Sequence, residues 1–222
     1  MQPEALITIE QVRRALRSPL PGLLAQMRMS PQPRPGTERI LDPNLSCRHA
    51  GVLVLLYPCP QSCTVRGEVL CLVLTRRSET VPNHQGQISF PGGSMEPGET
   101  AVAAALREGW EELRIPSTAL EVIGELSPLY IPHSGFCIHP VVAYTPKRPA
   151  FLPCAEEVVE VIEVPLAHLL DPLTRREETR LIRGEIMHVP FYAIGSHKVW
   201  GATAMVLAEL LALLTPTGAI AP

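Results

Sequence analysis

Short apolar runs alternate along the chain with segments of helical periodicity. The runs over 51–57 and 69–75 (GVLVLLY and VLCLVLT) flank a turn-rich segment and predict two buried strands. The same pattern predicts further strands over 121–126, 139–144 and 158–164, and helices over 166–170 and 199–214. Strands, a helix, more strands and a last helix indicate an α/β fold, in which helices pack on a mixed β-sheet.

The first fifth of the chain differs from the rest in its proline content. Residues 8–17 predict a short amphipathic helix, with Ile9, Val12 and Leu16 on one side. Six prolines between residues 18 and 44 exclude long regular elements there, so we expect an extended connector. The sequence thus predicts three parts along the chain: a helix and proline-rich extension over 1–46, a packed domain over 47–215 and a tail over 216–222.

Composition excludes several classes of protein. The chain has 222 residues, a mean hydropathy of +0.15 and a net charge of -3, so it lacks the basic excess of a nucleic-acid-binding protein. The N-terminus has neither the apolar run of a secretory signal nor the acid-poor composition of a transit peptide. The longest apolar stretch, over 202–214, is too short to span a bilayer and contains Glu209. We expect a cytoplasmic protein that contacts neither a membrane nor a nucleic acid.

Six cysteines are scattered through the chain, at positions 47, 59, 63, 71, 137 and 154. The chain is far longer than the small domains that disulfides usually hold together, so we expect reduced thiols. Cys59 and Cys63 are spaced as the first half of a zinc site, but no second Cys/His pair follows at the spacing of a zinc finger. A zinc site is therefore the less favoured interpretation.

The segment over 92–116 (GGSMEPGETAVAAALREGWEELRIP) carries the candidate chemistry. Thr100 has the side chain of an N-cap, and a proline ends the predicted helix after about four turns. Apolar or small residues fall on one side of this helix: Val102, Leu106, Gly109 and Leu113. Glu108, Glu111 and Glu112 fall together on the opposite side.

Two interpretations remain open for the three glutamates. One is a solvated face, which is typical of charged helix surfaces. Glu108 lies three and four residues from the other two, and like charges at these spacings cost roughly 0.2 to 0.5 kcal/mol per pair. The helix dipole also disfavours anions near the last turn, by roughly 0.3 to 1 kcal/mol each. Both costs are removed if a hard cation, Mg²⁺ or Mn²⁺, binds the carboxylate oxygens, and this second interpretation is favoured.

This segment resembles the signature of the Nudix hydrolases. The fixed positions of that signature are occupied by Gly93, Glu99, Arg107, Glu108, Glu111, Glu112 and Ile115. The sequence departs from it at Gly109, where the family usually has an aliphatic or small apolar residue, and at Arg114, where it has glycine. Gly109 lies on the packing side, so we expect a closer approach of helix and sheet there. Arg114 occupies the place of a left-handed C-cap, where a non-glycine residue costs roughly 1 to 2 kcal/mol unless the chain exits differently.

The resemblance implies a Nudix-type α/β/α sandwich that hydrolyses a diphosphate linkage with the help of Mg²⁺ (or Mn²⁺). The implied metal ligands are the carbonyl of Gly93 and the carboxylates of Glu108, Glu111 and Glu112. Two more residues take supporting roles by the same resemblance. Arg107 orients the carboxylate cluster, and Glu99 supports the junction between the loop and the helix.

The general base is left open by the resemblance. Glu108 or Glu112 could accept the proton of the attacking water, and in several Nudix enzymes a glutamate of a later loop does so instead. In this sequence the candidates of that kind are Glu156 and Glu157, of which we favour Glu157. A polar turn before a strand is the alternative explanation for both.

Residues outside the signature resemble the coenzyme A pyrophosphatase branch of the family. The upstream match runs from Leu74-Thr75-Arg76-Arg77-Ser78 through His84 and Gly86 to Phe90-Pro91-Gly92-Gly93, with Pro82 where the branch has an arginine. The downstream match includes Ser134-Gly135-Phe136, Val164-Pro165-Leu166 and Val199-Trp200-Gly201. An arginine at that place could pair with phosphate, whereas proline carries no charge and donates no hydrogen bond.

The branch implies that coenzyme A or a derivative is cleaved to adenosine 3′,5′-bisphosphate and a 4′-phosphopantetheine product. The substrate-binding candidates are Arg76, Arg77, His84 and Phe136. Each has a structural alternative: the arginines end a strand in solvent, the histidine lies in a loop without a role, and the phenylalanine packs. Two functional alternatives also remain, a Nudix pyrophosphatase for ADP-ribose, dinucleotides or nucleoside triphosphates, and a Nudix-fold nucleotide sensor without turnover.

Overall fold

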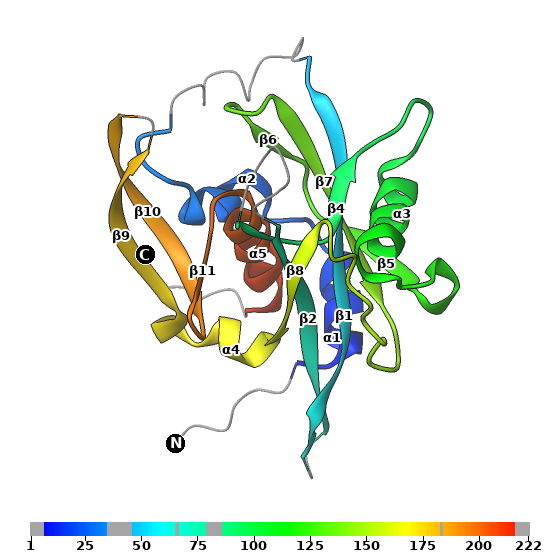
Figure 1. Cartoon of the computed structure of the whole chain (residues 1–222). Helices are drawn as coiled ribbons and strands as arrows, with labels where there is room; N and C mark the ends of the chain where they lie inside the picture. Colours follow the sequence, from blue (N-terminus) through cyan, green and yellow to red (C-terminus); the bar gives the residue numbers. More distant parts are fainter. Residues whose placement is uncertain (1–6, 35–45, 65–66, 79–85, 183, 216–222) are drawn as a thin grey trace.

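The computed structural model describes residues 7–34, 46–64, 67–78, 86–182 and 184–215 (Figure 1). The helices are α1 (Ile9–Leu16), α2 (Gly22–Gln26), α3 (Ala101–Leu113), α4 (Leu166–Leu170) and α5 (Gly201–Leu214), with short 3-10 turns η1 (Met27–Met29), η3 (Ser117–Ala119) and η4 (Pro172–Thr174). The strands are β1 (Arg48–Thr64), β2 (Gly67–Arg77), β3 (Ile88–Ser89), β4 (Gly92–Ser94), β5 (Glu121–Glu125), β6 (Leu129–Ile131), β7 (Phe136–Tyr144), β8 (Val158–Pro165), β9 (Arg175–Ile182), β10 (Glu185–Ile194) and β11 (His197–Trp200).

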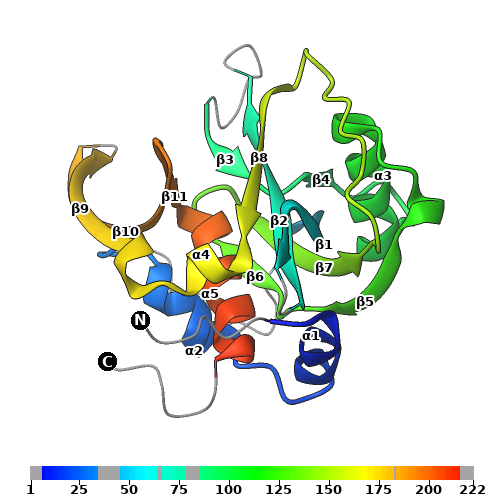
Figure 2. The ribbon, with the colours of Figure 1, turned by 90° about the horizontal axis from the view of Figure 1, so that it is seen from below.

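Eight of these strands form one mixed sheet. The main path has the order β3-β2-β1-β7-β5, while β4 pairs with β1, β6 with β7 and β8 with β2. Strands β1 and β7 run parallel, and the neighbouring pair of β1 and β2 is antiparallel. Helix α3 covers one face of this sheet and α5 the other (Figures 1 and 2). The expected α/β/α sandwich with a mixed β-sheet is confirmed.

Strand β1 is buried on both faces. Leu53, Leu55 and Tyr57 belong to the apolar cluster beneath α3, whereas Val54 and Leu56 belong to the cluster beneath α5. A strand with both faces covered has a continuous apolar run in place of an alternating pattern. This is why residues 51–57 were recognisable as a strand from the sequence.

Helix α3 approaches β1 closely because both elements carry glycine at the contact. A Cβ on Gly51 would lie 2.8 Å from the backbone N of Ala105. A Cβ on Gly109 would lie 2.7 Å from Cδ2 of Leu53. The expected close approach at Gly109 is therefore confirmed, and it brings the polar side chains of α3 against the neighbouring strands.

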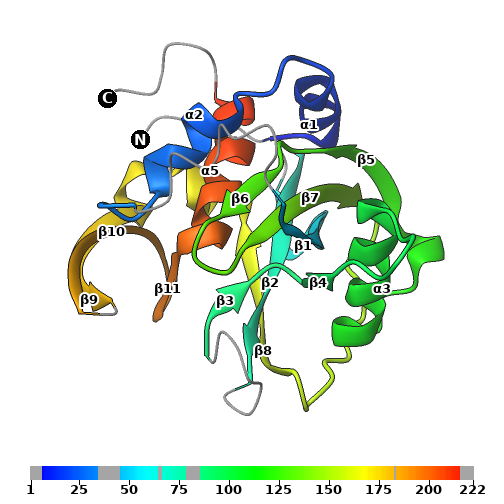
Figure 3. The same cartoon turned by 90° about the horizontal axis from the view of Figure 1, so that it is seen from above.

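The N-terminal segment packs on α5 (Figure 3). Helix α1 confirms the short helix predicted over 8–17; it begins after a capping box at Thr8, and Val12 is fully buried. The expectation of an extended connector over 18–44 is wrong for α2 and η1, because residues 22–29 contain no proline and form helical turns, while residues 35–44 lie outside the described ranges.

A buried carboxylate joins the N-terminal segment to α5. Glu209 is fully buried and accepts hydrogen bonds from the backbone N of Gly22 at 3.1 Å, the backbone N of Ser127 at 3.2 Å and Nε2 of Gln26 at 2.8 Å. The charge that interrupts the apolar stretch of α5 is therefore satisfied by donors from other elements. Among the described residues, no helix is long and apolar enough to cross a membrane.

Strands β9, β10 and β11 form a separate three-stranded antiparallel sheet beside α5 (Figures 2 and 3). The apolar pattern of the sequence did not predict this sheet. Strand β9 reads RREETRLI and buries little of its surface, so its apolar pattern is weak. The predicted helix over 199–214 begins only at Gly201, because Val199 and Trp200 end β11.

The expectation of reduced thiols is wrong for four cysteines. Disulfides join Cys47 to Cys137 and Cys59 to Cys71. The first bridges the start of β1 to the parallel strand β7, and the second bridges β1 to the antiparallel strand β2. Their distances along the chain, 90 and 12 residues, do not reveal which thiols the sheet places side by side.

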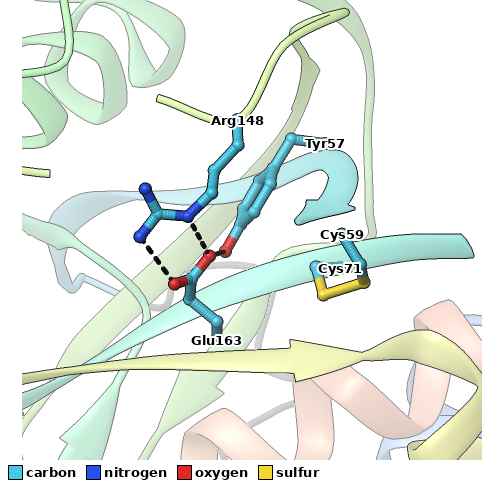
Figure 4. The surroundings of a disulfide bond; sticks show 5 residues. All are labelled: Tyr57, Cys59, Cys71, Arg148 and Glu163. Atoms are coloured by element: carbon cyan, nitrogen blue, oxygen red, sulfur yellow. Dashed lines mark hydrogen bonds and ion pairs between the residues drawn. A yellow bond between two sulfur atoms is a disulfide. The ribbon is translucent and has the colours of Figure 1, made fainter. Parts of the chain in front are cut away.

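A hydrogen-bonded ion pair lies beside the second disulfide (Figure 4). Arg148 binds Glu163 with Nε at 2.8 Å and Nη2 at 2.7 Å, and the hydroxyl of Tyr57 donates to the same carboxylate at 3.0 Å. Burial opposes ionisation of Glu163, but the hydrogen bonds from Arg148 and Tyr57 outweigh it and lower the pKa of this carboxyl below 4.5. The pair therefore stabilises the folded state only while Glu163 is ionised.

We predict that Glu163→Gln lowers the free energy of unfolding by about 1 kcal/mol at pH 7, after allowance for solvent screening. A depressed pKa contributes stability above the unfolded-state value, and this contribution is lost as the pH falls through the folded-state value. Urea midpoints of the variant and the wild type should therefore converge below about pH 4. Glu185→Gln, which removes an exposed carboxylate on β10, should show no such convergence. An equal difference at pH 7 and pH 3 would contradict the prediction.

The C-cap of α3 is strained. Arg114 has φ of 58° and ψ of 34°, and it is the one described residue other than glycine with a positive φ. Its backbone N donates to the carbonyl of Trp110 at 2.9 Å, so the chain leaves the helix by the left-handed route that the signature usually assigns to glycine. The chain therefore keeps the left-handed exit, and Arg114 bears the steric cost of this conformation.

Replacing Arg114 with glycine should raise the free energy of unfolding by about 1 kcal/mol, because glycine adopts this conformation without steric cost. Chemical denaturation at constant pH would measure the change. Arg114→Ala is the matched control, since it removes the contact with Trp110 but keeps a Cβ at positive φ. The interpretation fails if the glycine variant is no more stable than the alanine variant.

Candidate active site

Arg107 holds the loop before α3 against the helix. Its Nε and Nη2 donate to the carboxylate of Glu99 at 3.0 and 3.1 Å, and Nη2 also donates to the carbonyl of Ser94 at 3.0 Å. Its Nη1 donates to Glu108 at 2.8 Å and to Glu111 at 3.0 Å. The hydrogen bond to Glu99 is the largest cause that raises the pKa of Arg107, and the same bond lowers the pKa of Glu99. These contacts are the ones that an orienting role of Arg107 requires.

Glu112 lies between α3 and the strands, with only 1% of its side chain exposed. Nη1 of Arg77 lies 3.5 Å from Oε1, the backbone N of Gly92 donates to Oε1 at 3.4 Å, and the Thr75 hydroxyl donates to Oε2 at 3.4 Å. Burial raises the pKa of Glu112 to about 7, although Arg77 and Gly92 oppose this shift. The donors around Glu112 therefore compensate the charge of its ionised form only in part.

Glu108 lies against the loop that contains Gly93. A Cβ at Gly93 would overlap the Glu108 carboxylate, so glycine is needed there for the two to meet. The Glu108 side chain is 12% exposed, and its burial raises the pKa although Arg107 acts in the opposite direction. Glu111, one turn further along, is 46% exposed.

The three glutamates do not share one solvated face. Strands β2 and β4 cover Glu112, so it lies on the buried side together with Gly109 and Leu113, and the sequence projection was wrong on this point. The cause is that α3 has strand neighbours on two sides, whereas the projection assumed one buried side. Only Glu111 fits the interpretation of a charged helix surface.

The donor set fits a hard divalent cation. Glu108, Glu111 and Glu112 supply carboxylate oxygens, and two of them are desolvated at an energetic cost that a cation would offset. Within the described ranges, the three carboxylates are not gathered within 4.8 Å of one another. Arg107 now lies between Glu108 and Glu111, and the exposed Glu111 side chain is the one that can rotate toward the other two.

The loop before β8 brings one further carboxylate to the cluster. Glu157 acts electrostatically on both Glu108 and Glu112, and its carbonyl accepts a hydrogen bond from the backbone N of Ser78 at 2.8 Å. Glu156 is exposed and has no such effect on either group. Of the two candidates for a general base in this loop, the structure therefore places Glu157 nearer the acidic cluster.

Arg76 and Arg77 point to different places, as neighbours on a strand do. Arg77 faces Glu112 beneath α3, whereas Nε of Arg76 donates to Glu160 at 3.0 Å. Arg76 lines a pocket of about 390 Å³ that also includes Gln87, Arg180, His197, Lys198 and Trp200. Sequence reasoning missed Arg180, His197 and Lys198, because the strands that carry them were not predicted.

The remaining substrate-binding candidates are placed less directly. The guanidinium of Arg48 lies 4.1 Å from the centre of the Phe136 ring, so one face of this ring is covered by the protein's own side chain. His84, and Pro82 before it, lie outside the described residues. The structure thus supports packing for Phe136 and leaves His84 as a prediction.

Comparisons with known proteins assign the chain to a family. The NUDIX domain matches residues 48–185. The chain is 34% identical over 186 residues to an uncharacterized Nudix hydrolase NudL from Photorhabdus laumondii, which covers 83% of this chain and 91% of that protein. It is 37% identical over 158 residues to the human mitochondrial coenzyme A diphosphatase NUDT8, with 69% of this chain and 66% of that protein covered. A solved Nudix hydrolase from M. smegmatis, RenU, is 22% identical, has a TM-score of 0.42 and covers 56% of this chain and 74% of that chain.

The chain belongs to the Nudix hydrolases and is a pyrophosphohydrolase of the group that resembles coenzyme A pyrophosphatases. Nudix hydrolases generally require divalent metal ions, which agrees with the carboxylate donors on α3.

We predict that Glu112→Gln lowers kcat by at least about 100-fold and does not lower the stability of the metal-free protein. The carboxyl pKa is raised in the folded state, so a neutral amide of the same shape removes an unfavourable buried charge at pH 8. Steady-state assays with Mg²⁺ and thermal melts with EDTA would measure the two effects. Glu185→Gln, which removes an exposed charge on β10, should change neither. Retention of most Mg²⁺-dependent activity in Glu112→Gln would contradict the assigned role.

Proposed function

We propose that this protein is a Mg²⁺-dependent pyrophosphohydrolase that cleaves the diphosphate bond of coenzyme A or its derivatives. The observation that carries the chemistry is the buried Glu112 carboxylate, held by Arg77 and Gly92 beside Glu108 and under the influence of Glu157. The observation that favours this substrate is the 37% identity to a protein named coenzyme A diphosphatase.

Water attacks one phosphorus atom, and the bridging P–O bond of the diphosphate breaks. The products are adenosine 3′,5′-bisphosphate and a 4′-phosphopantetheine. Bound Mg²⁺, for which Mn²⁺ is the alternative, supplies charge that neutralises the phosphoryl oxygens and acidifies the attacking water. Glu108, Glu111 and Glu112 would hold that ion together with the Gly93 carbonyl, and Arg107 and Glu99 fix the loop and the helix relative to each other.

Glu157 is the general base in this proposal. It lies in the loop before β8 and not on α3, so it does not belong to the set of ligands that the helix supplies. Its influence on Glu108 and Glu112 supports this placement. Glu108 and Glu112 remain the alternatives for the base, but both are committed to the metal here.

The pocket at Arg76 fits the remote end of coenzyme A. Arg180 and Lys198 both pair with Glu178, while Arg76 and His197 share Glu160, so basic side chains outnumber their acidic partners. The guanidinium of Arg180 also lies 4.8 Å from the centre of the Trp200 ring. Clustered arginine and lysine beside an indole suit a phosphate attached to an adenosine. This basic pocket could replace the arginine contact that Pro82 removes.

The proposal is tested with a substrate panel analysed by mass spectrometry. The purified protein and Mg²⁺ are incubated with coenzyme A, acetyl-coenzyme A, dephospho-coenzyme A, ADP-ribose, NADH and a dinucleoside polyphosphate. We expect adenosine 3′,5′-bisphosphate from coenzyme A at a rate well above the others. In the same assay Glu157→Gln should lower kcat by about 100-fold or more, while Glu156→Gln stays near the wild-type value.

Each other outcome has a defined meaning. Faster turnover of ADP-ribose or a dinucleotide keeps the Nudix chemistry and rejects coenzyme A as the substrate. Equal losses in Glu156→Gln and Glu157→Gln, or a loss in neither, reject Glu157 as the base. Binding of nucleotides without turnover of any of them would favour the nucleotide sensor and reject the enzymatic proposal.

A further inference from the structure

A second group of metal-ligating side chains lies at the start of strands β1 and β7, apart from the acidic cluster on α3. Its members are Cys47, His49, Cys137 and His139, which we call the Cys₂His₂ group. The ligand atoms of the first three all lie within 4.8 Å of one another. Nε2 of His139 lies 2.9 Å from Nδ1 of His49, so the fourth residue adjoins them.

The sheet explains why these four side chains meet. A Cys-x-His sequence occurs twice, once at the start of β1 and once in β7. The two strands are parallel, and His49 lies opposite Cys137. Side chains two residues apart on a strand share a face. All four therefore project on the same face of two adjacent strands, although about ninety residues separate the two pairs along the chain.

A disulfide accounts for only half of this arrangement. The bond between Cys47 and Cys137 needs two thiols at a Cα–Cα distance such as the 5.8 Å observed here, and it needs no neighbouring imidazole. Yet each cysteine is followed at the same spacing by a histidine, and the ring nitrogens of His49 and His139 face each other. Two sulfur and two nitrogen donors are a donor set that zinc takes in tetrahedral structural sites.

We propose that the Cys₂His₂ group binds one Zn²⁺ ion when its two thiols are reduced, so that a disulfide and a metal site alternate at this place. With Zn–S distances of about 2.3 Å and Zn–N distances of about 2.0 Å, a tetrahedral ion sets the sulfurs about 3.8 Å and the nitrogens about 3.3 Å apart. The nitrogens are already close to this separation. The sulfurs reach it by rotation of two half-buried side chains once their bond is broken.

The exchange balances as follows. Two equivalents of an external thiol reduce the disulfide, giving two protein thiols and one disulfide of the reductant. The two protein thiols then lose two protons to solvent, and the resulting thiolates bind Zn²⁺ with the two neutral imidazoles. Two thiolates cancel the charge of the ion. The loaded site is therefore neutral and can remain half-buried without an unpaired charge.

The site adjoins the catalytic loop through the backbone. The carbonyl of His49 accepts a hydrogen bond from the backbone N of Met95 at 2.9 Å, and Gly51 pairs with Gly93 two residues further along β1. Either the disulfide or the metal ion ties β1 to β7 at this end of the sheet. Both forms thus hold the strand against which the Gly93 loop is aligned.

The experiment titrates the full-length protein with Co²⁺ and then with Zn²⁺, without oxygen, before and after reduction by a phosphine. Excess Mg²⁺ occupies the carboxylates on α3 throughout. We expect one equivalent of Co²⁺ to give strong visible ligand-field absorption and a thiolate-to-cobalt charge-transfer band only in the reduced protein, and one equivalent of Zn²⁺ to remove both. Elemental analysis after gel filtration then gives one zinc per chain.

Variants decide which residues bind the ion. Cys137→Ser and His49→Asn should each weaken binding by more than about 100-fold, which exceeds the usual effect of losing a residue that only supports a ligand. His49 is exposed, so its replacement leaves the fold intact by circular dichroism. Cys59→Ser removes a thiol of the other disulfide and should bind as the wild type does.

Three results would overturn the proposal. The first is a reduced wild type without the charge-transfer band, and the second is an unchanged titration in Cys137→Ser. The third is equal metal binding before and after reduction. All of these readouts are independent of hydrolase activity, so they test this site whatever the substrate of the enzyme is.

Discussion

Helix α3 meets strand β1 through backbone atoms at Gly51, and the placement of the acidic cluster depends on this contact. A side chain there would run into the backbone of the first turns of α3. Because the helix lies so near the sheet, Glu112 is enclosed by β2 and β4, and Glu108 meets the loop at Gly93. Arg107 then fixes the distance between that loop and the helix. Three glycines and one arginine therefore position the carboxylates of α3; they are Gly51, Gly93, Gly109 and Arg107.

The same packing creates an electrostatic imbalance. Among the described residues, the carboxylates from α3, from the preceding loop and from the loop before β8 face two guanidinium groups, those of Arg107 and Arg77. Burial raises the pKa of both Glu108 and Glu112, which shows that the donors of the protein do not fully compensate the charge. A protein that spends folding stability in this way gains affinity for a cation, since binding removes the penalty.

The elements best predicted from the sequence are those that carry a long apolar run or clear helix signals. Strands β1 and β2 and helix α5 have long apolar runs. Helix α3 has an N-cap residue, apolar residues at helical spacing and a proline after its end. Strand β9 begins with four charged residues, has apolar residues only at its end and pairs at the edge of its sheet with β10, so local pattern does not distinguish it from a loop. Because β9 was not predicted, Arg180 and the pocket that it lines were not predicted either.

Contacts across the sheet were beyond prediction for a related reason. The order of strands decides that Cys47 meets Cys137 and that Glu157 influences Glu112, and nothing in the spacing of these residues encodes that order. By contrast, the ligands on α3 lie within one helix, where sequence distance fixes spatial distance. Of these ligands, the burial of the Glu112 side chain was not predicted, because a helical projection does not show how many elements pack against a helix.

The hydrogen bonds of Glu209 make the N-terminal segment part of the folded core. The donors that satisfy this fully buried carboxylate include Gly22 and Gln26, which precede the residues matched by the family, 48–185. A chain shortened to begin at residue 48 would keep α5 but leave the buried Glu209 carboxylate without the donors of Gly22 and Gln26, a loss of the kind that costs roughly 1 to 3 kcal/mol. The unit that folds thus extends on both sides of the segment matched by the family domain, because α1 and α2 pack on α5 outside residues 48–185.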